Sequence, residues 1–384
     1  MVIEQISTFV KTLGYRNVLF VKVTTECGQY GWGESGLSSR EYAVAGAIGH
    51  FKQFLIGKNA LDIGALWQEM YRSQYFEGGR VLSAAISAID IALHDIKGKH
   101  FNVPIYQLLG GKQRDKIPLF ATVTHPLDET IISHCQQRID EGWTHIRLTT
   151  GEHGAAQQST DYDTRKAIAR ASSVLVDVRH ALGPHIQLGI DFHHRLSVSE
   201  AKSLLNRIPP GTLDYIEEPI RSESPDSYYQ LRQSCSTPFA IGEELTSKWA
   251  FYPFLKQNLI DLARIDICNA GGFTESMKIA AMCELLYVDM MPHNPLSPLC
   301  SLATAHFCAA IPNLDSLEWL PYAEDISSYA AVFSHMPKTE GPFLLLPDVP
   351  GLGVDICEAS LKKLPFSYWE PPRLTKPDGS YTNW

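Results

Sequence analysis

From residue 116 onward, short apolar runs alternate with segments that have helical spacing. The eight runs are IPLFATV, THIRLTT, IQLGIDF, LDYIEEP, PFAIGEE, LARIDIC, VDMMPHN and LDSLEWL. Amphipathic segments such as SEAKSLLNRI and TESMKIAAMCELLY separate them. Strands that alternate with helices in this way are parallel, and eight such units close into a barrel. The sequence therefore predicts an α/β fold with a (β/α)8 TIM-type barrel over residues 116–344.

Residues 1–115 have a different pattern and predict a separate α+β domain. NVLFVKVTTE (17–26) alternates as a strand does, and glycines follow it at a turn. VLSAAISAIDIALHDIKGK (81–99) has helical spacing, and its many Ala and Ser residues indicate close packing against neighbours. We expect the tail, about 345–384, to return to this part of the chain, so that both together form a capping domain.

Composition excludes several classes of protein. The chain has 384 residues, of which 45% are hydrophobic, and its net charge is −9. A negative chain without a stripe of Lys and Arg is not expected to bind nucleic acid. No run approaches the roughly 18 apolar residues of a membrane helix, and the first residues lack the order of a secretory signal. The eight cysteines include no C-x-x-C pair, which indicates reduced thiols. We expect a cytoplasmic enzyme.

An ionisable residue stands at the end of each of the last six apolar runs. These residues are Asp191, Glu217, Glu243, Asp266, His293 and Glu318, at intervals of 26, 26, 23, 27 and 25 residues. Each interval is the length of one strand–helix unit, and the carboxyl ends of barrel strands share the rim that carries active sites. A single acid at such a turn is more often a solvated cap. The repeated register is what predicts a common site.

The first three of these residues are carboxylates that would repel one another without a cation. Oxygen ligands without cysteine favour Mg²⁺, with Mn²⁺ as a substitute, and leave positions for water and substrate oxygens. The sequence therefore predicts a metal site made of Asp191, Glu217 and Glu243.

Two histidines are candidates for proton transfer. Asp266 and His293 end adjacent strands, so the carboxylate can hold one ring nitrogen and leave the other as a base. A histidine in MPHNP would by itself more often be structural, and the pairing reverses that expectation. His193 lies two residues after Asp191, and on an alternating strand the two share a face, which predicts an acid. His194 would then face away and be structural.

These motifs resemble the enolase superfamily, and within it the mandelate racemase-like acid-sugar dehydratases. The resemblance rests on GIDFH, YIEEP, AIGEE, RIDICNAGG, PHNPLSP, PGLGV and GWGES, and it covers essentially the whole chain. The catalytic set is most similar to that of galactonate dehydratases. DFHHRL and the closing DGSYTNW are also similar to mannonate dehydratase-like proteins.

The resemblance implies a hydro-lyase that converts an aldonate such as galactonate into a 2-keto-3-deoxy acid. The three predicted ligands would hold Mg²⁺, with Glu218 behind them. His293, oriented by Asp266, would remove the proton next to the substrate carboxylate. His193 would protonate the departing 3-hydroxyl group, and Glu318 would act in catalysis by contacting the carboxylate.

The chain departs from the family pattern where many members have K-x-K, because Arg147 and Thr149 stand there. Arginine is a poor proton acceptor, since its pKa stays above about 12. A racemase with two bases is therefore disfavoured, and we expect Arg147 to bind a substrate hydroxyl or carboxylate. In mannonate dehydratase-like members an arginine here pairs with a tyrosine, for which Tyr162 is the candidate. Asp266 is not expected in that subgroup, which favours the histidine base.

Two alternatives to the dehydratase stay open: a racemase or epimerase of a hydroxy acid, and a low-activity or non-catalytic sugar-acid sensor. The retained base, acid and ligands argue against the sensor. The resemblance also implies a homo-oligomer, either a dimer or an octamer. Segments near residues 11–17 and 72–80 would cover the active site and exclude water. The sequence does not reveal which sugar acid is used.

Overall fold

The computed structural model describes residues 1–14, 16–72, 75, 78–150, 162–319, 329–371 and 373–382. The chain forms two compact units. The first unit comprises residues 1–118, 243–251 and 265–370, and the second comprises residues 119–242, 252–264 and 371–384. The chain passes from one unit to the other within strand β4 (Lys116–Val123) and helix α9 (Lys248–Lys256), and also after residues 242, 264 and 370.

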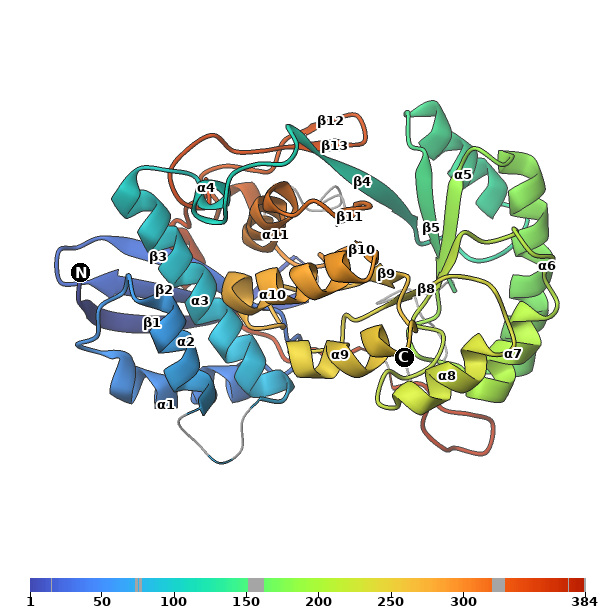
Figure 1. Ribbon diagram of the computed structural model, residues 1–384, viewed down its shortest axis with the longest axis horizontal. Coiled ribbons are helices and arrows are strands. Elements are labelled where there is room, and N and C mark those ends of the chain that lie inside the picture. The colour runs from blue at the N-terminus through green and yellow to red at the C-terminus, as the bar shows by residue number, and fades with distance from the viewer. Residues whose placement is uncertain are drawn as a thin grey trace. The chain divides into compact units, whose positions relative to one another are not determined.

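The first unit begins with an antiparallel sheet and the helices that cover it (Figure 1). The strands pair in the order β1 (Ile3–Leu13), β2 (Arg16–Thr25) and β3 (Tyr30–Ser35). The helices that follow are α1 (Glu41–Leu55), α2 (Ile63–Arg72), α3 (Arg80–Phe101) and α4 (Ile105–Leu108). Helix α3 contacts β3 and also packs against α1 and α2. This is the α+β pattern that the sequence predicts for this part of the chain.

Close packing of α3 on β3 accounts for the glycines of GWGES and for the small residues of the helix. A Cβ atom at Gly33 would lie 1.8 Å from the carbonyl oxygen of Ala88, so only glycine permits this approach. The helix ends at Phe101, and the left-handed backbone of the next residue, Asn102 (φ 56°), lets the chain turn.

The later part of the first unit contains short strands and three helices within the described residues. The strands are β10 (Asp289–Met290), β11 (Leu317–Trp319), β12 (Thr339–Glu340) and β13 (Phe343–Leu345); the helices are α10 (Gly272–Leu285), α11 (Pro298–Ala310) and α13 (Glu358–Lys363). The tail contacts the N-terminal sheet, since Lys22 Nζ lies 2.9 Å from Glu358 and the Tyr30 hydroxyl donates to Asp355 at 2.6 Å. A capping domain completed by the tail, about residues 345–384, stays a prediction. The division into units assigns residues up to 370 to the first unit and later ones to the second.

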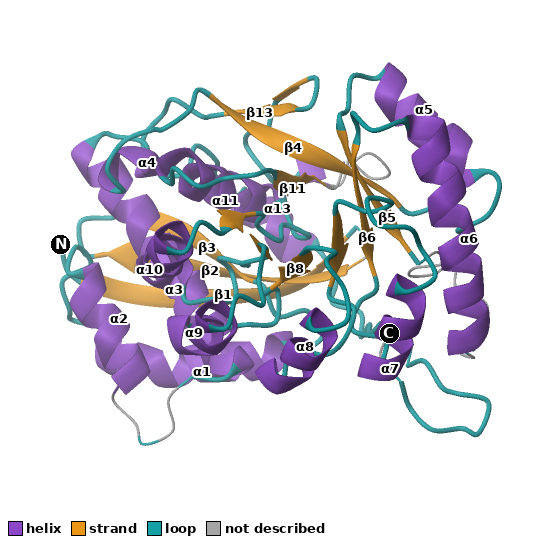
Figure 2. Ribbon diagram, turned by 45° about the vertical axis from the view of Figure 1, so that its right-hand side comes forward, coloured by secondary structure: helices purple, strands orange, loops and turns teal. Residues whose placement is uncertain are grey.

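The second unit is built on parallel strands that follow one another in sequence order from β4 to β9. After β4 come β5 (His145–Thr149), β6 (Gln187–Asp191), β7 (Tyr215–Glu217), β8 (Phe239–Ile241) and β9 (Leu262–Ala263). The intervening helices are α5 (Ile131–Asp140), α6 (Thr164–Leu182), α7 (Val198–Leu205) and α8 (Pro225–Arg232). Figure 2 shows α5 and α6 side by side along β5 and β6. Each of the eight predicted apolar runs contains a strand, from β4 to β11.

The two segments predicted to cover the site are only partly described. Residues 11–17 form the ends of β1 and β2 rather than a long loop, and Tyr15 lies outside the described residues. Within 72–80, residues 73, 74, 76 and 77 lie outside them as well. A covering role for both segments stays a prediction.

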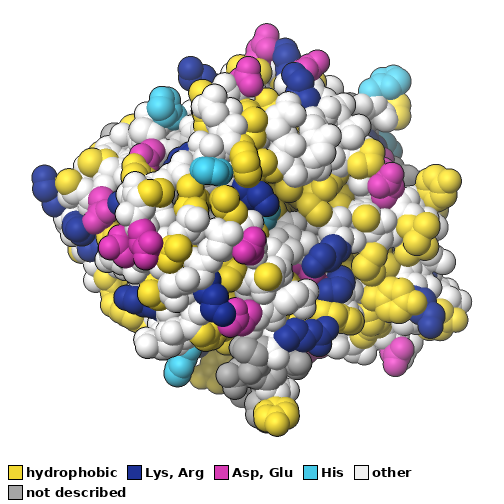
Figure 3. All heavy atoms as spheres, turned by 60° about the vertical axis from the view of Figure 1, so that its left-hand side comes forward, with side chains coloured by type: hydrophobic (Ala, Val, Ile, Leu, Met, Phe, Trp, Pro, Cys, Tyr) yellow, Lys and Arg dark blue, Asp and Glu magenta, His cyan; other side chains and the backbone are white. Residues whose placement is uncertain are grey.

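Figure 3 shows basic, acidic and apolar side chains on the face that it draws. Among the helices of the described residues, none has both the length and the apolar character needed to cross a bilayer.

Candidate active site

The parallel strands of the second unit bring two predicted metal ligands to one edge. Asp191 and Glu217 are the last residues of β6 and β7, and strand register pairs them directly. On the other side, Asp191 is paired with Thr149 at the end of β5. Both carboxylates are buried, with 1% and 0% of their surface exposed. The strand–helix interval that is visible in the sequence therefore does place these two groups together.

Two buried arginines hold the Glu217 carboxylate. Arg147 Nη1 donates to Oε1 at 2.8 Å and to Oε2 at 3.0 Å, and Arg264 Nε donates to Oε1 at 2.8 Å. The two guanidinium groups also lie 5.1 and 5.4 Å from the ring of Phe120. Arg264 was not identified from the sequence. A contact between Arg147 and substrate stays a prediction, because the arginine is engaged here with Glu217.

His193 lies beside Asp191, as predicted, but the reason given by the sequence is wrong. Strand β6 ends at Asp191, and both His193 and His194 have left-handed backbone, with φ of 46° and 60°. A turn, and not strand alternation, therefore directs the side chain. His193 N donates to Asp191 Oδ1 at 2.9 Å, and its Nε2 lies 3.0 Å from Oδ2. His194 is buried 3.3 Å from Glu218, which fits a structural role.

The Asp191 carboxyl group is ionised in this environment. Burial raises its pKa, but the neighbouring His193 and Arg147 outweigh burial and hold the pKa well below its usual range. Its buried Oδ2 accepts no aligned hydrogen bond from the described residues. An ionised carboxylate with such an oxygen suits a hard cation.

The third predicted ligand, Glu243, belongs to the first unit. Its side chain is 13% exposed, and its Oε2 lies 3.7 Å from His293 Nε2. Within the described residues, no three His, Cys, Asp or Glu side chains are arranged as a finished metal site. The donor chemistry fits Mg²⁺, because all three predicted ligands are carboxylates and one carries the buried oxygen described above.

The first unit contains the predicted pair of Asp266 and His293. His293 Nδ1 lies 3.0 Å from Asp266 Oδ2 in a hydrogen bond. Asp266 is fixed in turn by Cys268 N at 2.8 Å and by Asn269 Nδ2 at 3.0 Å. The other ring nitrogen of His293, Nε2, faces Glu243. This geometry is that of an oriented imidazole with one nitrogen available for proton transfer.

Glu318 is buried in β11 and is held through Asn294. Asn294 N donates to Glu318 Oε2 at 3.1 Å, and Asn294 Nδ2 donates to the Glu318 carbonyl at 3.0 Å. Ser301 Oγ in turn donates to Asn294 Oδ1 at 3.1 Å. Glu318 therefore has a fixed position in the unit that also carries His293.

The pKa of His293 is raised to about 9. Burial lowers it, but the charge of Glu243, the hydrogen bond to Asp266 and the charge of Glu318 outweigh burial. Because this pKa exceeds the ordinary value of 6.5, the charged ring stabilises the fold below about pH 6.5. That contribution is lost as the pH rises through about 9.

Nuclear magnetic resonance of metal-free protein should therefore show a histidine that titrates near pH 9 and is missing from His293→Asn. In Glu243→Gln the pKa should fall, because the largest favourable charge is removed. Loading with Mg²⁺ should lower it too, since a cation offsets the charge of Glu243. A His293 ring that titrates below pH 7 in metal-free protein would contradict the arrangement.

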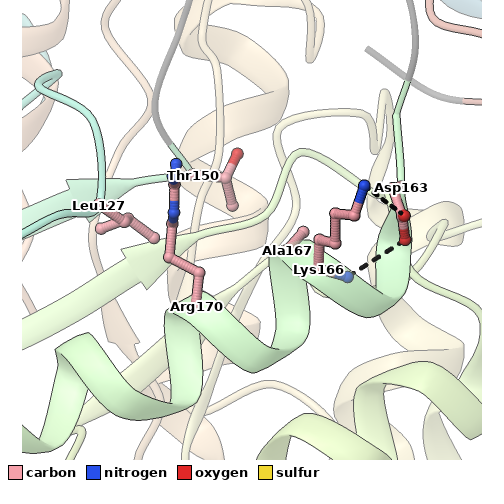
Figure 4. A pocket seen from close by; sticks show the side chains of 6 residues that line it. All are labelled: Leu127, Thr150, Asp163, Lys166, Ala167 and Arg170. Atoms are coloured by element: carbon pink, nitrogen blue, oxygen red, sulfur yellow. Dashed lines mark hydrogen bonds and ion pairs between the residues drawn. The ribbon is translucent and has the colours of Figure 1, made fainter.

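A cavity of about 280 Å³ opens in the second unit at the start of α6 (Figure 4). Its lining consists of Leu127, Thr150, Asp163, Lys166, Ala167 and Arg170. Lys166 and Asp163 are paired with each other, at 3.5 Å between Nζ and Oδ2. Because none of the predicted catalytic residues lines this cavity, it adds no reacting group to the site.

Tyr162 does not pair with Arg147 as the mannonate dehydratase-like pattern suggests. Its ring lies 5.6 Å from Cζ of Arg195, and its hydroxyl makes no hydrogen bond within the described residues. Burial raises the pKa of this hydroxyl to about 12. Arg195 is a second buried arginine that the sequence did not identify.

Comparison with known proteins places the chain in a family. Residues 3–110 match the family described as mandelate racemase / muconate lactonizing enzyme, N-terminal domain, and residues 130–360 match the family described as enolase C-terminal domain-like. The chain is 33% identical over 382 residues to a D-galactonate dehydratase of Ralstonia pickettii (strain 12J), covering 95% of this chain and 96% of the relative. It is 35% identical over 373 residues to a D-galactonate dehydratase of Xanthomonas euvesicatoria pv. vesicatoria (strain 85-10), with the same coverage.

The structure is also similar to a crystal structure of an enolase from Pantoea ananatis with bound D-gluconate and Mg. The TM-score is 0.92, with 30% identity and 99% of each chain covered. A second crystal structure, an enolase from Agrobacterium radiobacter bound to Na and L-malate, gives a TM-score of 0.89 with 25% identity over 100% of both chains.

A capping domain and an α/β barrel, with acids and histidines at the strand ends, define an enzyme of the enolase type. The chain belongs to the mandelate racemase / muconate lactonizing enzyme family of the enolase superfamily. Membership confirms the resemblance and the predicted fold class, an α+β capping domain with a (β/α)8 barrel. It also confirms the predicted enzyme class, a hydro-lyase.

Proposed function

We propose that this protein is a Mg²⁺-dependent dehydratase of an aldonate, with D-galactonate as the first candidate, and that it releases a 2-keto-3-deoxy acid. The D-galactonate dehydratase relatives support the substrate class, and the neighbouring structure with D-gluconate and Mg supports both substrate and cation. The observation that carries the proposal is the hydrogen bond of 3.0 Å that orients His293 on Asp266.

Asp191, Glu217 and Glu243 would hold the cation. When bound, Mg²⁺ supplies positive charge beside the substrate carboxylate, which makes the neighbouring C–H bond more acidic. Arg147 and Arg264 fix the orientation of Glu217 before any ligand arrives. Pre-set ligands of this kind reduce the reorganisation that binding would otherwise require.

His293 accepts the proton from C2 through Nε2, because Nδ1 is bonded to Asp266. His193, in its protonated form, gives a proton to the hydroxyl on C3, which leaves as water. The C2–H and C3–O bonds break and a C2=C3 double bond forms. The resulting enol then tautomerises to the 2-keto-3-deoxy acid. Glu318, held by Asn294, would contact the carboxylate end of the substrate.

A library of sugar acids, scored for 2-keto-3-deoxy product, tests this function. We expect product from at least one aldonate with Mg²⁺ and none after removal of the metal with EDTA. Exchange at the α-carbon without loss of water would indicate a racemase or epimerase. Binding of sugar acids with no product from any of them would indicate a sensor. The proposed homo-oligomer, a dimer or an octamer, can be checked on the same sample by light scattering.

His193→Asn should damage the loss of the hydroxyl more than the exchange of the α-proton. His193 touches Asp191 and is the proposed acid, whereas the proposed base is His293. Dehydration should fall by about 10²-fold or more. Product formation and α-deuterium exchange should be measured in parallel, with the exposed His185→Asn as the matched control. Equal losses of both activities in His193→Asn would contradict the division of roles.

A further inference from the structure

Arg195 ends the turn that follows β6, four residues after Asp191. Its side chain is buried, with 6% exposed, and its backbone N donates to Phe192 O at 3.2 Å. Nη1 donates to Thr150 Oγ1, and Cζ lies 5.6 Å from the centre of the Tyr162 ring. The guanidinium group therefore lies inside the second unit near the edge that carries the predicted ligands.

Several polar atoms in this part of the second unit are buried without a hydrogen-bond partner among the described residues. Within the described residues these atoms are Nε and Nη2 of Arg195, the hydroxyl of Tyr162 and Oγ1 of Thr149. Thr149 ends β5 as the register partner of Asp191, so it belongs to the same edge. Buried polar groups are almost always satisfied in proteins, because an unmet group loses its hydration without compensation. Arg195 and Tyr162 contact each other and both have this property, and together they indicate a place prepared for a polar ligand.

A structural arginine of the same unit shows the contrast. Arg179 donates from Nε to Thr212 O at 2.9 Å and from Nη2 to Asp214 Oδ2 at 2.6 Å. Its Nη1 donates to two backbone carbonyls, so every nitrogen is used. Arg195 donates through Nη1 alone, and Nε and Nη2 make no hydrogen bond to any described residue. Structural hydrogen bonds within the described residues therefore do not explain the presence of Nε and Nη2 at this place.

Nε and Nη2 lie on one edge of a guanidinium group and present two parallel N–H bonds. That edge matches two adjacent oxygen atoms, as in a 1,2-diol or a carboxylate. The hydroxyl of Tyr162 can add one more hydrogen bond, as donor or acceptor. The polyol end of an aldonate carries adjacent hydroxyl groups and no second carboxylate, so the proposed substrate class favours a diol at this edge.

We propose that Arg195 and Tyr162 form a subsite for two adjacent hydroxyl groups on the polyol end of the substrate, beyond the reacting C2 and C3. This assignment rests on the proposed function, and it identifies the residues that select the substrate by its chain length. A long aldonate would fill the subsite, whereas a short 2-hydroxy acid would leave it empty. The subsite therefore governs selectivity by chain length and not the chemistry at C2.

Binding measurements on the Mg²⁺-loaded protein test the subsite, in a His293→Asn background that prevents turnover. The probes are D-galactonate, L-lactate, which has no distal hydroxyl, and D-galactarate, which has a distal carboxylate. Arg195→Lys keeps the charge but removes the paired N–H edge, and it should weaken D-galactonate binding by about tenfold or more. L-Lactate binding should change by less than about twofold, because the lost contact is remote from its atoms. The exposed Arg165→Lys on α6 serves as the matched control.

Tyr162→Phe keeps the test decisive if Arg195→Lys fails to fold. It removes a hydroxyl that bonds to no described residue, so the thermal midpoint should not fall, while D-galactonate binding should weaken about threefold to tenfold. Equal losses for D-galactonate and L-lactate, or no loss for either, would overturn the subsite. A larger loss for D-galactarate than for D-galactonate would overturn the assignment to a diol.

The failure of the subsite and the failure of the proposed function can be told apart. If the protein with His293 intact dehydrates an aldonate, but both variants bind D-galactonate as tightly as their parent, only the subsite is wrong. If that protein dehydrates no aldonate at all, the proposed function is wrong, and the subsite is rejected with it.

Discussion

His293→Asn should lower kcat/KM for aldonate dehydration by about 10² to 10⁴-fold, because the ring is the group placed to accept the α-proton. Asparagine keeps an N–H group that can still reach Asp266, so the hydrogen bond of 3.0 Å has a replacement. It has no nitrogen that can accept a proton near neutral pH. Steady-state rates and α-hydrogen exchange in D₂O should both fall, since one base serves both processes.

Two further variants show whether a loss of kcat/KM in His293→Asn is specific to this histidine and its partner. Asp266→Asn should reduce kcat/KM as well, because the ring loses the carboxylate that fixes its orientation. His50→Asn, an exposed histidine of the same unit, should leave the rate unchanged. A loss of less than tenfold in His293→Asn, in protein that folds and binds Mg²⁺, would remove His293 from its role as base.

The fold was predictable because its signal is local. Each barrel strand is a short apolar run between amphipathic helices, and all eight runs contain strands in the structure. Strand lengths were less predictable. β9 and β10 have only two residues each, since the chain leaves the sheet well before Asp266 and His293. Hydrophobicity continues through LARIDIC and VDMMPHN because most residues after the strands are buried in irregular segments, so the sequence pattern does not mark where pairing ends.

The sequence predicts which site residues lie together when their positions depend on the interval between strands. It does not predict contacts that depend on how far a long side chain extends. The interval placed Asp191 next to Glu217. Arg264 was not predicted as a site residue, although a charged residue inside the apolar run LARIDIC indicates a buried charge that needs a partner. A buried arginine requires an anion, and Glu217, two strands away from it in order, is that anion. The turn that places His193 depends on left-handed backbone at two non-glycine residues, which composition does not indicate.

Glu217→Gln should lower the free energy of unfolding of the metal-free protein by about 3–5 kcal/mol. Arg147 and Arg264 are 4% and 0% exposed and share this one carboxylate as a hydrogen-bond partner. Glutamine has the same shape and can still accept hydrogen bonds, but it carries no charge. Two cations would then stay buried near each other with less compensation, which costs more than the loss of a hydrogen bond.

Urea denaturation in the presence of EDTA measures this effect apart from any change in metal binding. Glu141→Gln is the matched control, because Glu141 pairs with Arg138 on the exposed face of the second unit and should matter by less than about 1 kcal/mol. Arg264→Gln added to Glu217→Gln should recover part of the lost stability, since it removes one of the two cations that the Glu217 charge compensates. If Glu217→Gln is no more costly than Glu141→Gln, the arginines do not depend on Glu217, and their role in fixing this ligand has to be abandoned.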